Sequence, residues 1–347
     1  MVFEQIATGG CQSYLLGCPE SCAAVLIDPA LAQADRYAGL LGRLGLRLKY
    51  IFDTHTHADH FSAARRLREA LGAPIVMHRL SPSPHVDIRL EDGDILAAGA
   101  LRLRAIHTPG HTADSMCLLA GDRLFTGDTL LIGATGRTNL PTGDPEALFD
   151  SLFERILKLP PQTRVHPAHD YKGRGSTTIG EEIAGNPRLQ KRERADFVAM
   201  MRDLNLSAPD HMNEALRTNM NGGKTIDQVL AEAAAKVPFM SLEELSATIS
   251  RRPNDFIVLD VREAGAFDSA HVPGAVHLPR GQLELRVNEV LPDPTLRILA
   301  VCEFGKISTL AAATLRDLGF PRAVALEGGM KAWRERGFPV EAVQPQV

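Results

Sequence analysis

The feature that most constrains this 347-residue chain is a dense polar turn that follows an apolar strand. Residues Thr54–His60 read Thr-His-Thr-His-Ala-Asp-His, after the strand-like segment Arg47–Phe52 and before the helix-like segment Phe61–Leu71. Four imidazole or carboxylate side chains within six residues are typical of a metal site at a strand-to-helix turn. The alternation of strands and helices predicts a layered α/β fold around it.

Further metal-ligand candidates follow later strand-like segments. They are His111 in Thr108-Pro-Gly-His-Thr112, Asp128 in Phe125-Thr-Gly-Asp-Thr129 and His169 in His166-Pro-Ala-His-Asp170. We expect these side chains to join the four of the first turn at one edge of a sheet. The remaining isolated histidines are interpreted as ordinary surface or core residues: His78, His85, His107 and His211.

Length and composition bound the remaining alternatives. At about 150 residues per domain the chain predicts two domains, and 44% hydrophobic with 23% charged residues is globular. A net charge of −4 offers no basic surface for nucleic acid or an acidic membrane. No apolar run approaches the roughly 20 residues of a membrane span, and residues 1–10 lack a signal-peptide pattern, so a cytoplasmic protein is expected.

Residues 1–223 resemble the metallo-β-lactamase superfamily, whose fold is a four-layer αβ/βα sandwich. Within it, the chain is similar to the persulfide dioxygenases in several motifs: Tyr14-Leu-Leu-Gly17, Ala24-Val-Leu-Ile-Asp-Pro29, Asp53-Thr-His-Thr-His-Ala-Asp-His60, Thr108-Pro-Gly-His-Thr112, Thr126-Gly-Asp-Thr-Leu-Leu-Ile132, Gly136-Arg-Thr138 and Pro167-Ala-His-Asp-Tyr171. This resemblance implies one non-haem Fe(II) per chain, held by His55, His111 and Asp128, with a persulfide and O2 as substrates. It places His57, Asp59, His60 and His169 nearby, outside the ligand set.

A glyoxalase II-like thioester hydrolase with two zinc ions is the alternative within the superfamily, because it would use all seven side chains. We favour the dioxygenase on the Gly136-Arg-Thr138 segment, Tyr171 and the second domain. Arg137 is a candidate for binding a substrate carboxylate, or else for bracing a loop by pairing with a buried acid. Tyr171 is a candidate for donating a hydrogen bond near the metal. Asn139 departs from the acidic residue that is common there in the family.

A second candidate site lies at Cys302, which ends the strand-like segment Ile298–Val301. A helix is expected to begin at Ser308, so the N–H groups of residues 303–308 and the helix dipole would favour a thiolate. Cys117 is interpreted as packing, and no comparable context surrounds the other cysteines: Cys11, Cys18 and Cys22.

Residues 238–347 resemble a rhodanese (sulfurtransferase) domain, a parallel α/β fold, after a linker at 224–237. The resemblance rests on Leu259-Asp-Val-Arg-Glu263, His271-Val-Pro-Gly-Ala275, Cys302-x-x-Gly305-x-x-Ser308 and Glu327-Gly-Gly-x-x-x-Trp333. It implies that Cys302 carries a persulfide within a loop of six residues, which we call the Cys302 loop: Glu303, Phe304, Gly305, Lys306, Ile307 and Ser308. Because Glu303 and Ile307 stand where arginines are frequent, Lys306 is the loop's only cation and thiosulfate binding is expected to be weak.

The combined prediction is a persulfide dioxygenase fused to a sulfurtransferase. Its partners would be small thiols and persulfides, with glutathione as co-substrate or product and a homodimer as the candidate assembly. Two further alternatives are a catalytically inactive rhodanese fold used for docking, and a sulfur or redox sensor that binds a partner through Cys302.

Overall fold

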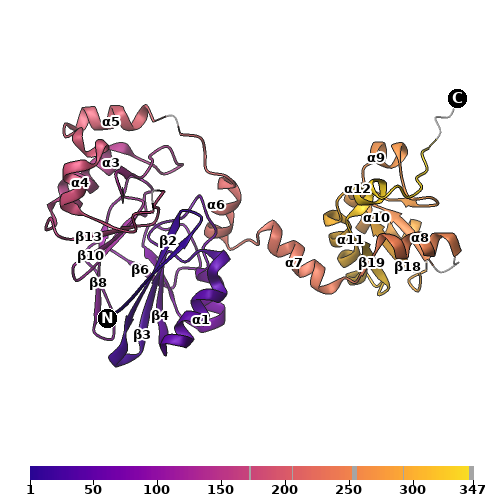
Figure 1. Ribbon diagram of the computed structural model, residues 1–347, viewed down its shortest axis with the longest axis horizontal. Coiled ribbons are helices and arrows are strands. Elements are labelled where there is room, and N and C mark those ends of the chain that lie inside the picture. The colour runs from indigo at the N-terminus through magenta and orange to yellow at the C-terminus, as the bar shows by residue number, and fades with distance from the viewer. Residues whose placement is uncertain (172, 205, 252–255, 292, 344–347) are drawn as a thin grey trace. The chain divides into compact units, whose positions relative to one another are not determined.

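The computed structural model describes residues 1–171, 173–204, 206–251, 256–291 and 293–343. The chain forms two compact units, Met1–Gly223 and Lys224–Val347 (Figure 1). Among the described residues, no helix has the length and apolar character that crossing a membrane requires.

Two six-stranded sheets form the centre of the first unit. The first has the order β1 (Val2–Thr8), β2 (Cys11–Cys18), β3 (Ala23–Ile27), β4 (Arg47–Phe52), β5 (Ile75–His78), β6 (Ile88–Leu90). The second has the order β14 (Thr177–Thr178), β13 (Arg164–Pro167), β10 (Arg123–Gly127), β9 (Met116–Ala120), β8 (Leu101–His107), β7 (Ile95–Ala98). A short hairpin, β11 (Leu130–Leu131) and β12 (Ala134–Thr135), follows β10.

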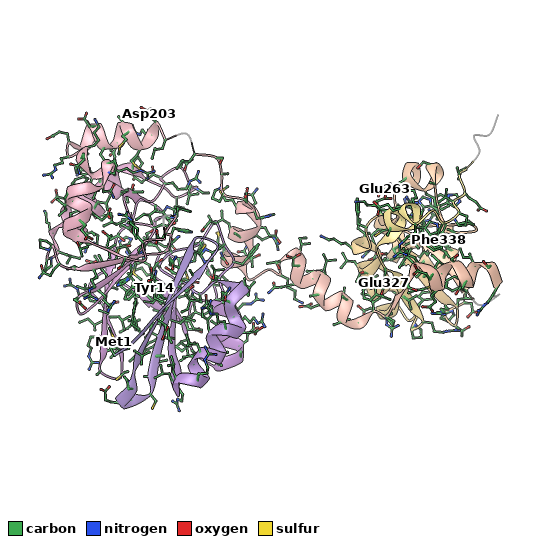
Figure 2. All side chains as sticks on the ribbon, in the orientation of Figure 1. Met1, Tyr14, Asp203, Glu263, Glu327 and Phe338 are labelled. Atoms are coloured by element: carbon green, nitrogen blue, oxygen red, sulfur yellow. The ribbon has the colours of Figure 1, made fainter. Side chains whose placement is uncertain are left out.

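Helices cover the outer faces of the two sheets, so the first unit has four layers. The helices are α1 (Ala34–Leu44), α2 (Ala64–Leu71), α3 (Pro145–Phe149), α4 (Ile179–Gly185), α5 (Arg194–Arg202) and α6 (Met212–Asn221). Tyr14 (Figure 2) belongs to the core between the sheets, as does Phe125. Tyr37 of α1 and Phe197 of α5 are buried in the cores that these helices cover. This is the αβ/βα sandwich that the sequence predicts.

Two helices begin or continue differently from the sequence prediction. Helix α2 starts at Ala64 and not at Phe61, because residues 61–63 pair with 29–31 in a short bridge and the Ser62 hydroxyl accepts the Ala64 N–H. The sequence pattern also predicts one helix over residues 145–157, but this segment is α3 followed by a π-helical turn at Asp150–Arg155 and a 3₁₀ turn at Ile156–Lys158.

The second unit contains a fully parallel five-stranded sheet. Its order is β15 (Phe239–Met240), β19 (Ala323–Leu326), β18 (Arg297–Val301), β16 (Phe256–Asp260), β17 (Val276–His277). The helices are α7 (Ile226–Lys236), α8 (Leu242–Arg251), α9 (Ala264–Ser269), α10 (Leu283–Val290), α11 (Lys306–Asp317) and α12 (Gly329–Glu335). Alternate residues of β18 face opposite cores, as parallel strands buried on both faces require.

Helix α7 occupies most of the segment 224–237, which the sequence suggested as a linker. The side chains of Ala233 and Val237 join the core of the second unit, and the helix packs against α11. The Thr225 side chain caps its first turn by accepting the N–H of Gln228. The described structure therefore assigns α7 to the second unit.

Candidate functional site

The histidine-rich turn after β4 is anchored by a buried carboxylate. Asp28, at the end of β3, accepts hydrogen bonds from the Thr54 N–H at 2.7 Å and the Thr54 hydroxyl at 2.9 Å. It also lies 3.2 Å from His57 Nε2. Asp28 has φ of 49°, a left-handed conformation that is uncommon outside glycine. The sequence analysis did not identify this residue as part of the site.

Three of the predicted ligands lie together and form what we call the first cluster: His55, His111 and Asp128. Their donor atoms lie within 4.8 Å of one another, and all three residues are buried. His55 comes from the turn after β4, His111 from the loop between β8 and β9, and Asp128 from the end of β10. The fold thus brings together residues that are up to 73 positions apart (128 − 55).

Each imidazole of the first cluster has one nitrogen occupied and one available. His55 Nδ1 lies 2.9 Å from the Thr54 hydroxyl, and His55 Nε2 is buried with no hydrogen-bond partner among the described residues. His111 Nδ1 lies 2.8 Å from the Arg137 carbonyl oxygen, to which it donates, and His111 Nε2 lies 3.4 Å from an Asp128 oxygen. Such outer hydrogen bonds orient histidine ligands around a metal.

The charge states of the first cluster also suit a cation. Burial, together with the charges of His57 and His111, lowers the pKa of His55 to about 3, so its imidazole is neutral at pH 7. Burial opposes ionisation of Asp128, but His169 and the neighbouring histidines hold the pKa of Asp128 below its usual range. The neutral His55 imidazole, the His111 ring and the Asp128 carboxylate are therefore donors that fit a divalent metal ion.

A second cluster adjoins the first and consists of Cys11, Asp59, His60 and His169, whose donor atoms also lie within 4.8 Å of one another. His169 joins the two clusters: its Nδ1 lies 2.7 Å from Asp128 Oδ1, and its Nε2 lies 2.7 Å from Asp59 Oδ2. Burial opposes protonation of His60 and His169, but Asp59 raises the pKa of His60 to about 10, and Asp128 and Asp59 raise the pKa of His169 well above its usual range.

The remaining predicted residue of the turn, His57, lies between the clusters and a buried acid pair. Its Nε2 faces Asp28 and, at 3.9 Å, Asp53, while its Nδ1 has no partner among the described residues. The ring of His57 stands 4.1 Å from those of His55 and His60, measured between centroids. All seven predicted side chains therefore belong to one contiguous polar region.

Cys11 lies beside His169 in the second cluster, a context different from that of Cys302. Its sulfur lies 3.4 Å from His169 Nε2, because Gln12 N–H donates to the Ala168 carbonyl and holds the start of β2 beside residue 169. Cys11 and His169 are 158 positions apart, so their spacing contains no signal. Burial would raise the pKa of Cys11, but hydrogen bonds with His169 and His60 lower it.

A cavity of about 480 Å³ opens onto both clusters. Asp59, His111, Asp128 and His169 line its polar part, and the segment Ser207–Asp210 lines another wall. A volume of this size is typical of a site for a small organic molecule.

The two predicted substrate-binding residues line the same cavity in different ways. Arg137 donates from Nε to Asn139 and from Nη2 to the carbonyl oxygens of residues 206 and 207, so its guanidinium braces the cavity wall. Tyr171 is 79% exposed and stacks on His169, with ring centroids 5.6 Å apart. Arg137 therefore braces a loop, but its partners are an amide and two carbonyl oxygens and not the buried acid that was expected.

Cys302 lies in the second unit at the end of β18 and is 2% exposed. The Ser308 N–H donates to its sulfur at 3.2 Å, and the sulfur lies 3.3 Å from the Ser308 hydroxyl oxygen. Gly305 turns the loop with φ of 84°, and its carbonyl accepts the hydroxyls of Ser308 and Thr309. Helix α11 begins at Lys306, two residues before the expected start. The Cys302 sulfur therefore contacts the first turn of α11, to which Ser308 belongs.

The Cys302 loop is fastened by two backbone hydrogen bonds from the first turn of α12. The Met330 N–H donates to the Cys302 carbonyl at 2.8 Å, and the Lys331 N–H donates to the Glu303 carbonyl at 3.0 Å. A Cβ on Gly329 would lie 2.4 Å from the Cys302 carbonyl oxygen. This close approach gives a physical reason for the Glu-Gly-Gly segment.

Glu303, the acidic residue of the Cys302 loop, pairs with two arginines. Glu303 accepts from Arg262 Nη1 at 3.1 Å and forms an ion pair with Arg334. Partial burial opposes ionisation, but these two guanidinium groups hold the pKa of Glu303 below its usual range. Phe304 and Ile307 are exposed, so the loop presents apolar surface as well as Lys306.

Comparisons with known proteins place both units. The model of the metallo-beta-lactamase superfamily matches residues 7–169, and the model of the rhodanese-like domain matches residues 241–336. Over 214 residues, the chain is 42% identical to the mitochondrial persulfide dioxygenase ETHE1 of Homo sapiens, covering 61% of this chain and 84% of that protein. It is 33% identical over 262 residues to a probable metallo-hydrolase of Burkholderia pseudomallei, covering 61% of this chain and 89% of that protein.

Solved structures agree with this placement. ETHE1 from Myxococcus xanthus superposes with a TM-score of 0.62 at 40% identity, covering 63% of this chain and 98% of that one. A metallo-beta-lactamase from Staphylococcus aureus superposes with a TM-score of 0.61 at 22% identity, covering 94% of this chain and 98% of that one. The second likeness shows a shared fold alone.

Proposed function

Because the chain belongs to the persulfide dioxygenase family of the metallo-β-lactamase superfamily and carries a rhodanese-like domain, we propose that it is an iron-dependent persulfide dioxygenase joined to a sulfurtransferase. The first unit would oxidise glutathione persulfide. In that reaction one persulfide, one O2 and one water give one glutathione, one sulfite and two protons.

The observation that carries the proposal is the first cluster, in which the donor atoms of two imidazoles and one carboxylate lie within 4.8 Å of one another. One Fe(II) would be held by His55, His111 and Asp128. Iron held by this donor set supplies redox chemistry with dioxygen and keeps coordination positions open for a substrate sulfur. The bonds of His55 to Thr54 and of His111 to the Arg137 carbonyl would keep both rings oriented.

The second cluster and the cavity supply the other requirements of the reaction. His169, whose pKa is raised, lines the cavity beside Asp59 and Asp128 and would exchange a proton with the bound persulfide. Tyr171 presents a phenol at the cavity mouth for a hydrogen bond to the substrate. Arg137 keeps the wall formed by residues 206–210 in place.

Metal analysis combined with oxygen uptake tests this function. We expect about one iron per purified chain, and oxygen consumption with glutathione persulfide that yields sulfite in a ratio of about one to one. If iron-loaded protein consumed no oxygen when persulfide was added, the proposal would be contradicted.

The second cluster favours one other candidate, a thioester hydrolase with two zinc ions. His57 Nδ1 and His60 Nε2 are buried without described partners, as expected if both bound metal. In that case His57→Ala and His169→Ala would remove metal as completely as His55→Ala, and wild-type protein would contain two zinc ions. The dioxygenase requires instead that His57→Ala retains part of its iron.

For the second unit we propose sulfane-sulfur transfer through Cys302. The thiolate attacks the outer sulfur of a donor, the donor's S–S bond breaks, and its electron pair leaves with the donor fragment. A thiol such as glutathione then accepts the sulfur. The bond from the Ser308 N–H to the Cys302 sulfur supports this role, because it stabilises negative charge there. Mass spectrometry should detect one added sulfur on the Cys302 peptide after treatment with a sulfane donor, and its absence would contradict transfer.

A further inference from the structure

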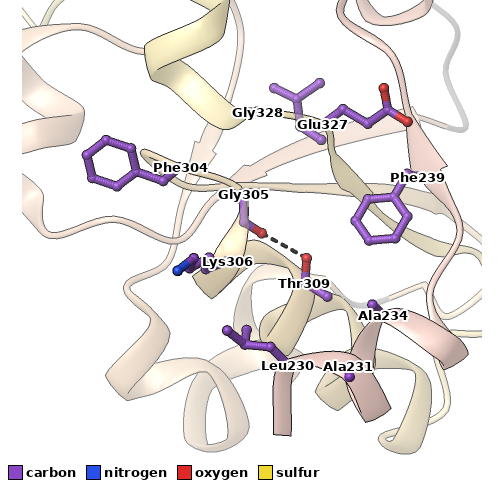
Figure 3. Close-up of a pocket in the computed structure, with 11 residues that line it drawn as sticks. Leu230, Ala231, Ala234, Phe239, Phe304, Gly305, Lys306, Thr309, Glu327 and Gly328 are labelled. Atoms are coloured by element: carbon purple, nitrogen blue, oxygen red, sulfur yellow. Dashed lines mark hydrogen bonds between the residues drawn. The ribbon is translucent and has the colours of Figure 1, made fainter. Parts of the chain in front are cut away.

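A largely apolar cavity of about 500 Å³ lies beside the Cys302 loop (Figure 3). One wall consists of Phe304, Gly305 and Lys306 of the loop, with Thr309 of α11. The opposite wall consists of Leu230, Ala231 and Ala234 of α7, with Phe239 of β15. The segment Leu326–Gly328 completes the lining.

Helix α7 lies outside the part of the chain that matches the rhodanese-like domain, residues 241–336. It nevertheless packs on α11, and its Ala233 belongs to the same core cluster as Cys302. The helix is thus on the face of the sheet toward which the Cys302 side chain points. The cavity therefore combines the sulfur-carrying loop with a wall that this chain adds to the domain.

The Cys302 loop connects this cavity to the sulfur. Gly305 lines the cavity, and its carbonyl accepts the hydroxyl of Ser308, whose N–H donates to the Cys302 sulfur. Thr309, which also lines the cavity, donates its hydroxyl to the same carbonyl. A molecule in the cavity would contact the turn that holds the sulfur.

The lining indicates the chemistry of the occupant. Six of its side chains are apolar, and its charged residues are Lys306 and Glu327. Figure 3 shows these two charged side chains extending in opposite directions. A thiosulfate dianion would leave most of the apolar wall uncovered and would meet one lysine, so a small inorganic anion fits this cavity poorly.

We propose that this cavity binds the organic thiol that accepts sulfur from Cys302. The acceptor carries an apolar portion against α7 and Phe239, a carboxylate at Lys306 and an ammonium group at Glu327. Amino-acid-type thiols, of which glutathione is the probe, have this chemistry. The inference rests on the proposed sulfurtransferase function and specifies its acceptor.

The transfer step balances without an added oxidant. The acceptor thiolate attacks the outer sulfur of the Cys302 persulfide, and a new S–S bond forms to the acceptor. The bond between the outer sulfur and Cys302 Sγ breaks, and its electron pair remains on Cys302 as a thiolate. The proton of the acceptor thiol passes to solvent.

The test fills the cavity and compares a large acceptor with a small one. The full-length protein is loaded with inorganic polysulfide and freed of excess reagent. Single-turnover sulfur release is then followed with glutathione and with cyanide, after subtraction of Cys302→Ser protein treated in the same way. Ala231→Phe and Ala234→Phe place rings in the cavity, whereas Val229→Phe, on an exposed part of α7 outside the lining, is the matched control.

We expect the glutathione-to-cyanide ratio of second-order rate constants to fall about tenfold or more in both cavity variants, and less than about twofold in Val229→Phe. An unchanged ratio in the cavity variants, with wild-type transfer intact, would overturn the acceptor site. Failure of wild-type protein to release sulfur to either acceptor would instead overturn the sulfurtransferase function.

The carboxylate contact is tested separately at Lys306. Lys306→Met should slow release to glutathione about tenfold and release to 2-mercaptoethanol, which has no carboxylate, less than about twofold, while Lys306→Arg should restore most of the glutathione rate. Equal slowing with both thiols would overturn the assignment of Lys306 to the acceptor carboxylate.

Discussion

The two units build their candidate sites by different means. In the first unit, side chains from widely separated strand ends converge, and the site joins residue 11 to residue 169 through direct contacts. In the second, one cysteine sits in a loop of six residues, and backbone groups from nearby turns hold it. The first site therefore depends on the packing of a whole sandwich, whereas the second depends on one turn and the backbone hydrogen bonds that fasten it.

This difference makes the two sites separable by mutation. We expect this separation because the residues of each candidate site belong to one compact unit. The predictions below either separate the sites further or show that they depend on each other.

The largest effect is expected from loss of a first-cluster ligand. In His111→Ala, we expect iron content and oxygen uptake to fall at least about 100-fold, because two donors cannot hold the metal. Sulfur release from Cys302 should stay within about twofold. Metal analysis, an oxygen electrode and the single-turnover assay measure the three quantities.

His85→Ala is the control for that experiment, since it removes a histidine of the first unit that lies outside both clusters. Iron content equal to wild type in His111→Ala, or equal loss in His85→Ala, would contradict the assignment of the first cluster.

The converse change is Cys302→Ser. Serine conserves the volume but cannot carry a persulfide, so sulfur transfer should stop. Oxygen uptake with supplied glutathione persulfide should remain within about twofold of wild type. Cys22→Ser, an exposed thiol of the first unit, is the control. If Cys302→Ser loses oxygen uptake to the same degree as sulfur transfer, Cys302 delivers sulfur to the first site and the two sites are not independent.

An intermediate effect is expected at Gly136, which lies close to two residues of the first cluster, Asp128 and His111. A Cβ there would lie 1.9 Å from the Asp128 carbonyl oxygen and 3.0 Å from His111 Nδ1. We expect Gly136→Ala to weaken iron binding about 10- to 100-fold and to lower the free energy of unfolding by about 1–3 kcal/mol.

Gly42→Ala, inside α1 with no atom within 4 Å of the added Cβ, is the control and should stabilise the protein slightly. Normal iron affinity in Gly136→Ala would show that the first cluster tolerates displacement of the Asp128 backbone.

The sequence predicts the second site better than the first because the determinants of the second are local. The Cys302 loop and its helix lie within one short segment, and the strand and helix periodicity identifies them. The metal-ligand candidates also follow from motifs that each end a strand, whereas the four-layer sandwich is implied by the resemblance of these motifs to a known family. Their resemblance to a known family supplies the choice of three ligands, which the residue types alone leave open.

What the sequence does not predict depends on long-range placement. Asp28 reads as the end of a strand, and only the folded sheet shows that it anchors Thr54 and faces His57. Cys11 reads as an isolated thiol, because its partner His169 comes from the other sheet. Helix α7 reads as a linker, because its packing against α11 arises only in the folded second unit.

The smallest expected effect concerns acid stability of the first unit. Burial and the charge of the stacked His107 lower the pKa of His78 to about 4, and burial with the adjacent Arg123 lowers the pKa of His166 to about 4. In the unfolded chain these imidazoles bind protons near pH 6.5. Between pH 6.5 and 4 the unfolded state therefore binds more protons than the folded state, and the free energy of unfolding decreases as the pH is lowered. Asp53, whose pKa burial raises to about 7, acts in the opposite direction, so the histidine contribution must be isolated by substitution.

Urea unfolding of metal-free protein at pH 7, 6 and 5 should show wild type losing about 1–2 kcal/mol more than His78→Gln or His166→Gln over this range. A wild-type-minus-variant difference that does not change with pH would show that these two histidines titrate normally in the folded protein.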